Sequence, residues 1–278
     1  MIIGIIGLGF VGSAIEKSFN IKKIKIIKYD KYKDGGIGNI ENTLNTNILF
    51  LCLPTLFNKL TNEYDKTAIH EISEYLNINE YKGIIILKST VEPETTENLS
   101  IKYNLKFIHN PEFLTARTAF NDFHNQKHIV LGKSSNCNDE DLQLIKTFYN
   151  KYYNNAEISL CTSLESESMK IFCNSFYASK IQIFNEYYLL CKKNGANYNK
   201  IKELMLKNGW INKMHTDVPG PDGNLSYGGA CFPKDTNALK NYMDKNNTLN
   251  NVLSSVIIER DLLREEVNKL KNKNSLNL

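Results

Sequence analysis

The sequence predicts an α/β chain: a doubly wound parallel sheet over residues 1–162, followed by an all-helical domain over residues 163–278. Three observations predict this fold class. The chain opens with a buried strand, a glycine-rich turn and a helix; short apolar runs then alternate with amphipathic segments; and from about residue 163 only helical spacing remains. A chain of 278 residues is long enough for two modest domains with separate cores.

The opening segment MIIGIIGLGFVGSAIEKSF places the turn GLGFVG between the first strand and the first helix. The turn fits the pattern G-x-G-x-x-G through Gly7, Gly9 and Gly12, with Phe10 and Val11 between the last two. The first glycine permits the tight turn, the second lets a pyrophosphate approach the backbone, and the third allows close helix–strand packing. In this strand-to-helix context the motif predicts a Rossmann-type dinucleotide site.

The second predicted strand, IKIIKYD, ends at Asp30, 18 residues after Gly12. A carboxylate at this position accepts hydrogen bonds from a ribose 2′-OH and repels a 2′-phosphate, so it favours NAD over NADP. The alternative is an ordinary acid in a surface turn. The upstream glycine turn favours the cofactor interpretation, and NAD is the predicted cofactor.

The alternation continues with predicted strands at NILFLCLPT, GIIILKST, KHIVLG and AEISL. Predicted helices lie at KTAIHEISEYL, PETTENLSIKYN and DEDLQLIKTFYNKYY. Ligands of doubly wound sheets bind at the carboxyl ends of the strands, so Pro54, Thr55 and Thr90 are predicted to face the cofactor cleft. Each of them could instead be a simple helix cap.

Residues 163–195 predict one long helix that Ser163 caps and Gly195 ends. Lys170 and Asn174 are four residues apart and therefore share one face of this helix, which is otherwise apolar. Such side chains are costly to bury unless they serve a ligand. The plain alternative is a lysine that extends its head group to solvent and an asparagine bonded to the backbone.

Further helices are predicted at NKIKELMLKNG and over residues 250–273, with the Gly- and Pro-rich loop VPGPDGNLSYGGACFPKD between them. This loop sets Cys231 behind two glycines and ahead of Lys234 and Asp235. A reactive cysteine benefits from flexible backbone and from a nearby cation and acid, which a structural cysteine does not need. No pair of the six cysteines has CxxC spacing, so neither a metal site nor a disulfide framework is predicted.

The charge pattern argues against a nucleic-acid partner. The net charge is +4, and of the 34 Lys and Arg residues only Arg117, Arg260 and Arg264 are arginines, with no basic patch interleaved with aromatic residues. No run approaches the ~20 apolar residues of a membrane span. The apolar start lacks the basic region of a signal peptide. We expect a cytoplasmic protein with no membrane partner.

The motifs GLGFVG, KST, NPEF, a Lys and an Asn on a long helix, and GGACFPKD occur in this order across nearly the whole chain. The sequence thereby resembles the UDP-glucose/GDP-mannose 6-dehydrogenase family, whose NAD-dependent members oxidise the C6 alcohol of a sugar nucleotide to a carboxylate. The resemblance implies an oxidoreductase whose substrate is a nucleotide sugar. UDP-glucose is the first candidate, and another UDP- or GDP-sugar is the alternative.

The resemblance also implies roles for individual residues. Cys231 would attack the aldehyde formed by a first hydride transfer, and a second transfer would give a thioester for water to hydrolyse. Lys170 and Asn174 would stabilise the oxyanion, and Asp235 and Thr90 would position water and move protons. Lys234 would reach the cofactor phosphates. The residues implied to contact the sugar nucleotide are Glu112, Phe113 and Leu114 of the NPEF segment, His215, and Gly220, Asn224 and Gly228 of the loop.

Three departures from the family pattern stand out. The family usually has Glu-Gly where Ala116 and Arg117 stand, which puts one contact to the nicotinamide side in question and suggests a phosphate contact for Arg117. His215 stands where the family often sends an arginine to a neighbouring subunit. Family members usually continue with another α/β domain, so this chain is expected to be either a minimal enzyme or one part of a split one.

Other interpretations stay open. A β-hydroxyacid dehydrogenase also pairs a Rossmann-type domain with helices and a Lys–Asn pair, but it needs no cysteine. A non-catalytic NAD-binding relative is the second alternative. Helical spacing of Val252, Val256, Leu263, Val267 and Leu270 predicts an apolar stripe on the last helix. A second copy in a homodimer, or the helical domain itself, would cover this stripe.

Overall fold

The computed structural model describes residues 1–115 and 117–275, with side chains described as far as Glu265. Its contacts divide the chain into two compact units. The sheet unit contains Met1–Asn58 and Tyr64–Lys170, and the helical unit contains Lys59–Glu63 and Ile171–Leu278. The division falls inside the long helix α6, Ser163–Asn194, and not at its start.

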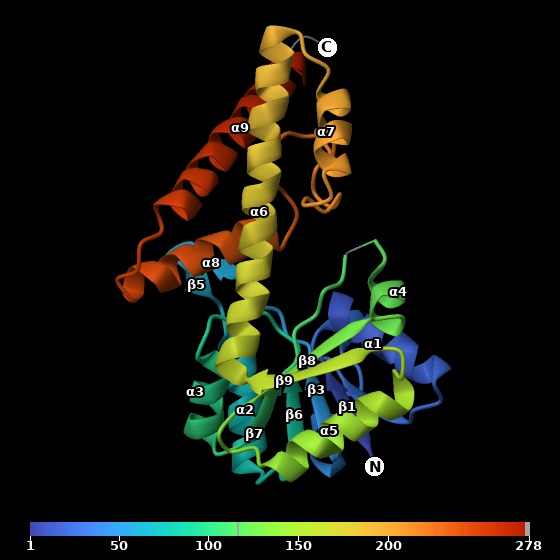
Figure 1. Ribbon diagram of the computed structural model, residues 1–278. Coiled ribbons are helices and arrows are strands. Elements are labelled where there is room, and N and C mark those ends of the chain that lie inside the picture. Colours follow the sequence, from blue (N-terminus) through green and yellow to red (C-terminus); the bar gives the residue numbers. More distant parts are fainter. Residues whose placement is uncertain (116, 276–278) are drawn as a thin grey trace. The chain divides into compact units, whose positions relative to one another are not determined.

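The sheet unit is built on seven strands (Figure 1). Their order across the sheet is β2 (Ile26–Tyr29), β1 (Ile3–Ile6), β3 (Ile48–Leu51), β6 (Ile84–Leu87), β7 (Lys106–His109), β8 (His128–Lys133) and β9 (Glu157–Thr162). The first five run parallel, β8 pairs antiparallel with β7, and β9 is parallel to β8. The Rossmann-type prediction is confirmed, but the expectation of a wholly parallel sheet is wrong for the last two strands.

Helices cover both faces of this sheet (Figure 1). One face packs against α1 (Phe10–Ile21), α4 (Ala119–His124) and α5 (Asp139–Tyr152), and the other against α2 (Thr67–Ile78) and α3 (Thr95–Tyr103). Two short 3-10 helices, Lys33–Gly35 and Ile40–Asn45, follow β2, and β4 (Phe57–Asn58) pairs with β5 (Glu63–Tyr64). Because both faces are covered, β1, β3 and β6 are unbroken apolar runs, as buried parallel strands require.

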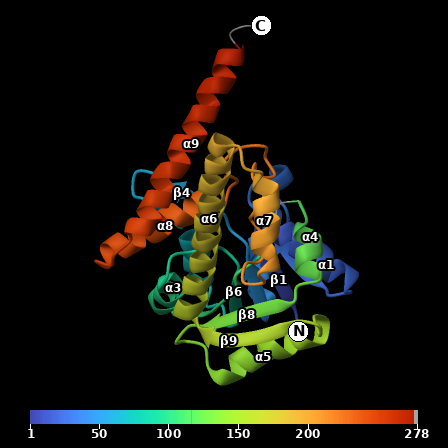
Figure 2. The same cartoon turned by 45° about the horizontal axis from the view of Figure 1, so that its top comes forward.

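The helical unit contains most of α6, together with α7 (Tyr198–Lys207), α8 (Phe232–Lys245) and α9 (Asn251–Ser275). Figure 2 shows α7 on one side of α6, and α8 and α9 on the other. The long helix was predicted with nearly the observed bounds, but its cap is Thr162 and not Ser163. Thr162 Oγ1 accepts a hydrogen bond from Glu165 N, and the Glu165 carboxylate accepts one from Thr162 N in return.

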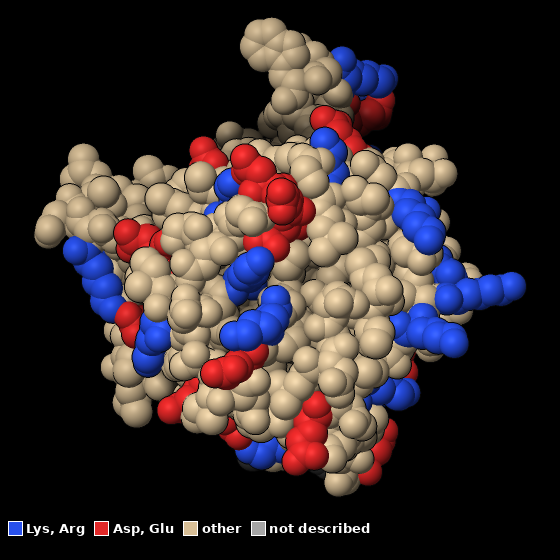
Figure 3. Space-filling view, turned by 90° about the horizontal axis from the view of Figure 1, so that it is seen from below, with Lys and Arg blue, Asp and Glu red and all other residues tan. Residues whose placement is uncertain are grey.

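The described residues hold no group of His, Cys, Asp and Glu side chains that could ligate a metal ion. None of the helices among the described residues combines the length and the apolar character that a membrane crossing needs. On the face drawn in Figure 3, acidic and basic side chains are interspersed.

The start of α6 carries a buried carboxylate that makes the stability of the protein depend on pH. Glu167 Oε1 accepts hydrogen bonds from the backbone N–H of Thr96 at 2.7 Å and from its hydroxyl at 2.5 Å. The side chain has no exposed surface. Burial outweighs these hydrogen bonds and raises the pKa of Glu167 from 4.5 to about 7.

We expect the protein to lose stability as the pH rises through this range. A raised carboxyl pKa favours the folded state fully below the unfolded value of 4.5, and this advantage is gone above pH 7. The loss is up to roughly 3 kcal/mol in the free energy of unfolding. Glu167→Gln keeps an acceptor for Thr96 and should flatten the dependence. Urea unfolding at pH values below and above this range measures the free energy of unfolding. The same pH dependence in the wild type and in Glu167→Gln would contradict the expectation.

Candidate active site

The glycine turn after β1 has no room for side chains at two of its three glycines. Gly7 has φ +87°, and an ideal Cβ there would lie 2.5 Å from the Cys52 carbonyl oxygen. A Cβ on Gly12 would lie 1.9 Å from the Gly7 carbonyl oxygen. Gly9, by contrast, has no atom within 4 Å of its ideal Cβ position, so its backbone faces open space. This is the geometry that a phosphate-cradling turn needs.

Asp30 lies at the end of β2 and is bonded to the glycine turn. Its carboxylate accepts hydrogen bonds from the backbone N–H groups of Leu8, Tyr32 and Lys33, at 2.6 to 3.0 Å. Burial raises the pKa of Asp30, but these three donors and the charge of Lys33 outweigh it and keep the pKa below its ordinary value. Asp30 is therefore ionised at neutral pH. Its bond to Leu8 joins it to the glycine turn, and its other two bonds are those of an acid in a surface turn, so its role toward the cofactor stays a prediction.

Sequence reasoning missed Lys33 at this site. The Lys33 ammonium donates to the Leu8 carbonyl at 2.8 Å and to the Ser13 hydroxyl at 2.9 Å, so it sits on the glycine turn beside Asp30. The only sequence signal was a lysine three residues after the strand-end acid, in a chain full of lysines. Its contacts, and not its spacing, identify it as a candidate for binding cofactor phosphate.

A cavity of about 620 Å³ opens at this turn, entirely within the sheet unit. Phe10 lines it, whereas Val11 packs against the core of the sheet. The volume, the open backbone at Gly9 and the ionised Asp30 together fit one end of a dinucleotide. The lining residues are Leu8, Gly9, Phe10, Ser13, Ala14, Lys17, Asp30, Lys33, Ala119 and Phe120.

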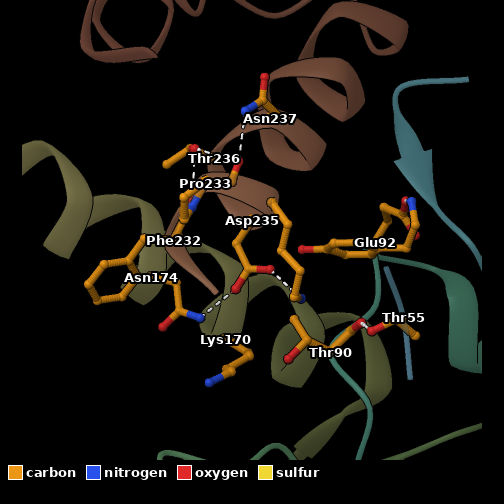
Figure 4. Close-up of polar contacts among 12 residues, drawn as sticks. Thr55, Thr90, Glu92, Lys170, Asn174, Phe232, Pro233, Asp235, Thr236 and Asn237 are labelled. Carbon is orange, nitrogen blue, oxygen red and sulfur yellow. Dashed lines mark hydrogen bonds and ion pairs between the residues drawn. The ribbon is translucent and has the colours of Figure 1, made fainter. Parts of the chain in front are cut away.

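Polar residues follow the neighbouring strands β3 and β6. The Thr55 hydroxyl donates to the Thr90 carbonyl oxygen at 2.8 Å, and both residues are buried (Figure 4). Pro54 beside them is exposed. The structure thus brings Thr55 and Thr90, two of the three predicted strand-end residues, together at one edge of the sheet. The Thr55 hydroxyl bonds to the Thr90 backbone and does not cap a helix.

The NPEF segment follows β7 and meets Lys170 of α6 inside the sheet unit. The Lys170 ammonium donates to the Glu112 carbonyl oxygen and lies 3.6 Å from the Glu112 carboxylate. It also lies 5.0 Å from the centroid of the Phe113 ring, while Leu114 N donates to Glu112 Oε2 at 2.6 Å. Lys170 is only 4% exposed, so the alternative of a lysine reaching to solvent is wrong.

Lys88 of the KST motif lies under this segment and was not predicted as a site residue. Its ammonium donates to Asn110 Oδ1 at 2.8 Å, and Asn110 also accepts from the Tyr149 hydroxyl at 2.6 Å. Complete burial lowers the pKa of Lys88 to about 8. A buried, hydrogen-bonded cation at this place supports the backbone from which Glu112 projects.

The helical unit carries Cys231 at the start of α8. Cys231 occupies the N-cap position, its carbonyl oxygen accepts the Asp235 N–H, and its side chain is exposed. Asp235 has no exposed surface and accepts hydrogen bonds from Asn174 Nδ2 at 2.5 Å and from the Lys234 ammonium at 2.6 Å (Figure 4). Asn174 therefore bonds to a carboxylate and not to backbone, one helical turn after Lys170.

His215 lies in the helical unit, where its ring is 5.1 Å from the Tyr177 ring and 5.4 Å from the Phe232 ring. Burial lowers its pKa, and the charge of Lys180 adds to this. Its predicted role toward a second subunit stays a prediction. Arg117 is exposed, and Ala116 lies outside the described residues.

Two family models match the chain in succession. Residues 38–153 match the NAD binding domain, and residues 164–259 the central domain, of the UDP-glucose/GDP-mannose dehydrogenase family. The chain belongs to this family. The family's members are NAD-dependent dehydrogenases, and NAD is the cofactor that the first matched domain binds.

Individual relatives of the family agree. The chain is 32% identical to a UDP-glucose 6-dehydrogenase of Rickettsia bellii over 78% of its own length and 50% of the relative's. It is 26% identical to the Campylobacter jejuni UDP-glucose 6-dehydrogenase over 96% of its own length and 73% of the relative's. The chain thus spans about half the length of several curated relatives that it matches.

A solved structure shows the shared fold of the family. The UDP-glucose dehydrogenase from Pyrobaculum islandicum superimposes with a TM-score of 0.84 at 21% identity. The superposition covers 99% of this chain and 71% of the other.

Proposed function

We propose that this protein oxidises the C6 alcohol of a nucleotide sugar, with UDP-glucose as the first candidate, to the carboxylate in two NAD-dependent steps. The observation that carries the proposal is Cys231. Among the described cysteines it is the exposed one, and it stands at the N-terminus of α8 beside the buried Asn174–Asp235 pair. The positive end of a helix favours negative charge on the sulfur, which is what a nucleophile needs.

The chemistry explains why a cysteine is required. Bound NAD accepts a hydride in each oxidation, but a free aldehyde offers no hydride route to an acid until a nucleophile adds to it. The Cys231 sulfur adds to the aldehyde carbon to give a thiohemiacetal, whose oxidation leaves a thioester. Water then releases the acid and restores the thiol. The balance is one alcohol, two NAD and one water to one carboxylate, two NADH and three protons.

The remaining residues take the roles that their contacts support. We assign to Lys170 and Asn174, which both carry N–H donors, the stabilisation of an oxyanion, and to Asp235, which already accepts from Asn174, the ordering of water or acceptance of a proton. Thr90 and Glu112 are the candidates from the sheet unit for proton transfer and for contact with the sugar. Phe113 and Leu114 would contact the sugar, as would Gly220, Asn224 and Gly228 of the loop.

A β-hydroxyacid dehydrogenase is the rival from the same fold class. It removes one hydride and stops at a ketone or aldehyde, so stoichiometry separates the two. A non-catalytic relative would bind NAD and turn over nothing.

The test is an NADH-release assay against a panel of UDP- and GDP-sugars, with β-hydroxyacids as the comparison. We expect two NADH per sugar oxidised and an acid as the product, because each of two hydride transfers reduces one NAD. One NADH per turnover with a carbonyl product would favour the rival. NAD binding without turnover on any substrate would favour the non-catalytic relative.

We also propose that the protein forms a homodimer, with α6 as the main contact surface. The predicted stripe on α9 is exposed at Val252 but not at Val256, which is buried against Ala178 and Tyr227. Val267 and Leu270 lie outside the residues whose side chains are described. The longer row of exposed large apolar side chains lies along one face of α6, at Phe172, Phe176, Ile183, Tyr187 and Leu190.

We expect Phe176→Asp to turn a dimer into a monomer, because it places a charge within this face, where Phe176 is 64% exposed. Lys192→Asp, on the opposite face of α6, is the matched control and should leave the dimer intact. Sedimentation of the purified chain measures both. A monomeric wild-type protein would contradict the proposed homodimer.

A further inference from the structure

Arg264 of α9 holds the loop that leads into Cys231, and none of the roles proposed above involves it. Arg264 Nη1 contacts Asp222 Oδ2 at 2.7 Å, and Arg264 Nη2 donates to the Ser226 carbonyl oxygen at 2.8 Å. One guanidinium therefore bridges two points of the loop, four residues apart. Only 17% of the Arg264 side chain is exposed, against 44% of the Asp222 side chain, so the bridge is shielded from water on its arginine side.

Gly228, the first glycine of GGACFPKD, lies where any side chain would meet this bridge. An ideal Cβ on Gly228 would lie 2.8 Å from Arg264 Nη2 and 2.9 Å from Asp222 Oδ2. Gly228 has an ordinary φ, so it is needed for close approach and not for its backbone angle. Gly229 differs, because it has φ +76° and no atom within 4 Å of its ideal Cβ position.

The same loop is tied to α6 at one residue. Ser226 N donates to Asn185 Oδ1 at 2.8 Å, and the Ser226 hydroxyl donates to Gln182 Oε1 at 2.5 Å. All three residues are buried. Ser226 also adopts φ +58°, a backbone conformation that a non-glycine residue keeps only when its surroundings impose it.

We propose that Arg264 is a positioning residue that sets the shape of the loop over residues 222–228 and thereby the place of the Cys231 sulfur. The proposal rests on the nucleophilic role proposed for Cys231. Attack requires the sulfur within about 3.5 Å of the carbon, and a misplacement of about 1 Å costs roughly 100-fold in rate. The bridge ends at Ser226, five residues before Cys231, so its loss frees the segment that carries the thiol.

The experiment compares three variants of the intact chain. Arg264→Gln removes the positive charge and the two guanidinium donors. Arg264→Lys keeps the charge but lacks the paired donors, and Gly228→Ala adds a methyl group where the guanidinium lies. Lys240→Gln is the control, because it removes a cation from an exposed ion pair with Asp244 in the same helical unit. Two readouts need no substrate: protease cleavage within residues 219–229, and alkylation of Cys231 by iodoacetamide followed in its peptide.

For Arg264→Gln we expect at least about tenfold faster cleavage of the loop, because the charged contacts of the guanidinium are lost and cleavage tracks the open population. The alkylation rate of Cys231 should change and kcat should fall, while the KM for NAD stays at the wild-type value. Arg264→Lys should lie between wild type and Arg264→Gln. A role in stability alone would instead lower the unfolding temperature and leave kcat per folded molecule unchanged.

Wild-type cleavage and alkylation in Arg264→Gln would overturn the proposal. If Arg264→Gln does not fold, Asp222→Asn decides, since it weakens the same ion pair at a partly exposed loop residue. Wild-type cleavage and alkylation in that variant would equally overturn it. If the wild-type chain oxidises no sugar nucleotide, the proposed function fails, while the two substrate-free readouts still decide the role of Arg264.

Discussion

We expect Cys231→Ala to abolish acid formation and to leave NAD binding intact. This is the largest effect we expect, because no other described cysteine is exposed and the second oxidation requires a sulfur adduct. The rate of acid release should fall by at least about 10³-fold. NAD binding should survive, since the glycine turn and Asp30 belong to the sheet unit and Cys231 to the helical unit.

The measurement is NADH release and product analysis beside a titration of NADH fluorescence. Cys161→Ala is the control, because it removes a half-buried thiol from β9 that has no proposed role. If Cys231→Ala still yields acid with two NADH per sugar, another nucleophile does the chemistry. If it yields aldehyde with one NADH, the first oxidation is independent of the thiol, as the proposed order of steps requires.

Gly12→Ala should have the second largest effect, on the cofactor site. The added methyl group would lie 1.9 Å from the Gly7 carbonyl oxygen, and both groups belong to backbone or to atoms fixed on it. The turn must therefore deform, at a cost of about 1–3 kcal/mol or more in the free energy of unfolding. NAD affinity should fall at least about 100-fold, because the deformed turn no longer presents its N–H groups to the pyrophosphate.

Gly9→Ala is the matched comparison. Its methyl group meets no atom within 4 Å, so the unfolding temperature should stay near that of the wild type. NAD affinity should still fall, by about tenfold, because the methyl group stands where the pyrophosphate approaches. Thermal unfolding and NADH titration of the two variants separate deformation from obstruction. Equal stability of both variants would contradict the packing argument for Gly12.

Periodicity predicted those elements whose local pattern agrees with their environment. The apolar runs of β1, β3 and β6 and the long helix α6 were found because burial on both faces, or a long helical stretch, leaves a clear pattern. Strand β7 was missed because its four residues, KFIH, begin with a lysine and end with a histidine. His109 is buried all the same, which lowers its pKa to about 3 and keeps the ring neutral.

The helix α8 was missed for a different reason. Its first turn, FPKD, lies inside a Gly- and Pro-rich segment that predicted a loop, although proline is well suited to the first turn of a helix. The direction of β8 and β9 was also beyond reach, since alternation of residues does not tell parallel from antiparallel pairing. For β8 and β9 the missing information was which distant segment packs alongside.

The residues of the candidate site also separate into those that the sequence predicts and those that it does not. Gly7, Gly12, Asp30 and Cys231 could be predicted because a short motif carries their geometry. Lys33, Lys88 and Arg264 could not be, because each acts through a contact with a residue 20 or more positions away in a lysine-rich sequence. Their neighbours along the chain give no sign of the acceptor that each one meets.

The close approach of Gly228 to Arg264 also restricts how this loop can change over evolutionary time. A lineage that gains a side chain at position 228 must shorten or reorient the one at position 264, since the two cannot share the space. Substitutions at the two positions should therefore arise in pairs, with Asp222 free to drift once the arginine is gone. Relatives that keep the double glycine should keep a long cation on the facing helix, and those that lose it should stabilise the loop by another route.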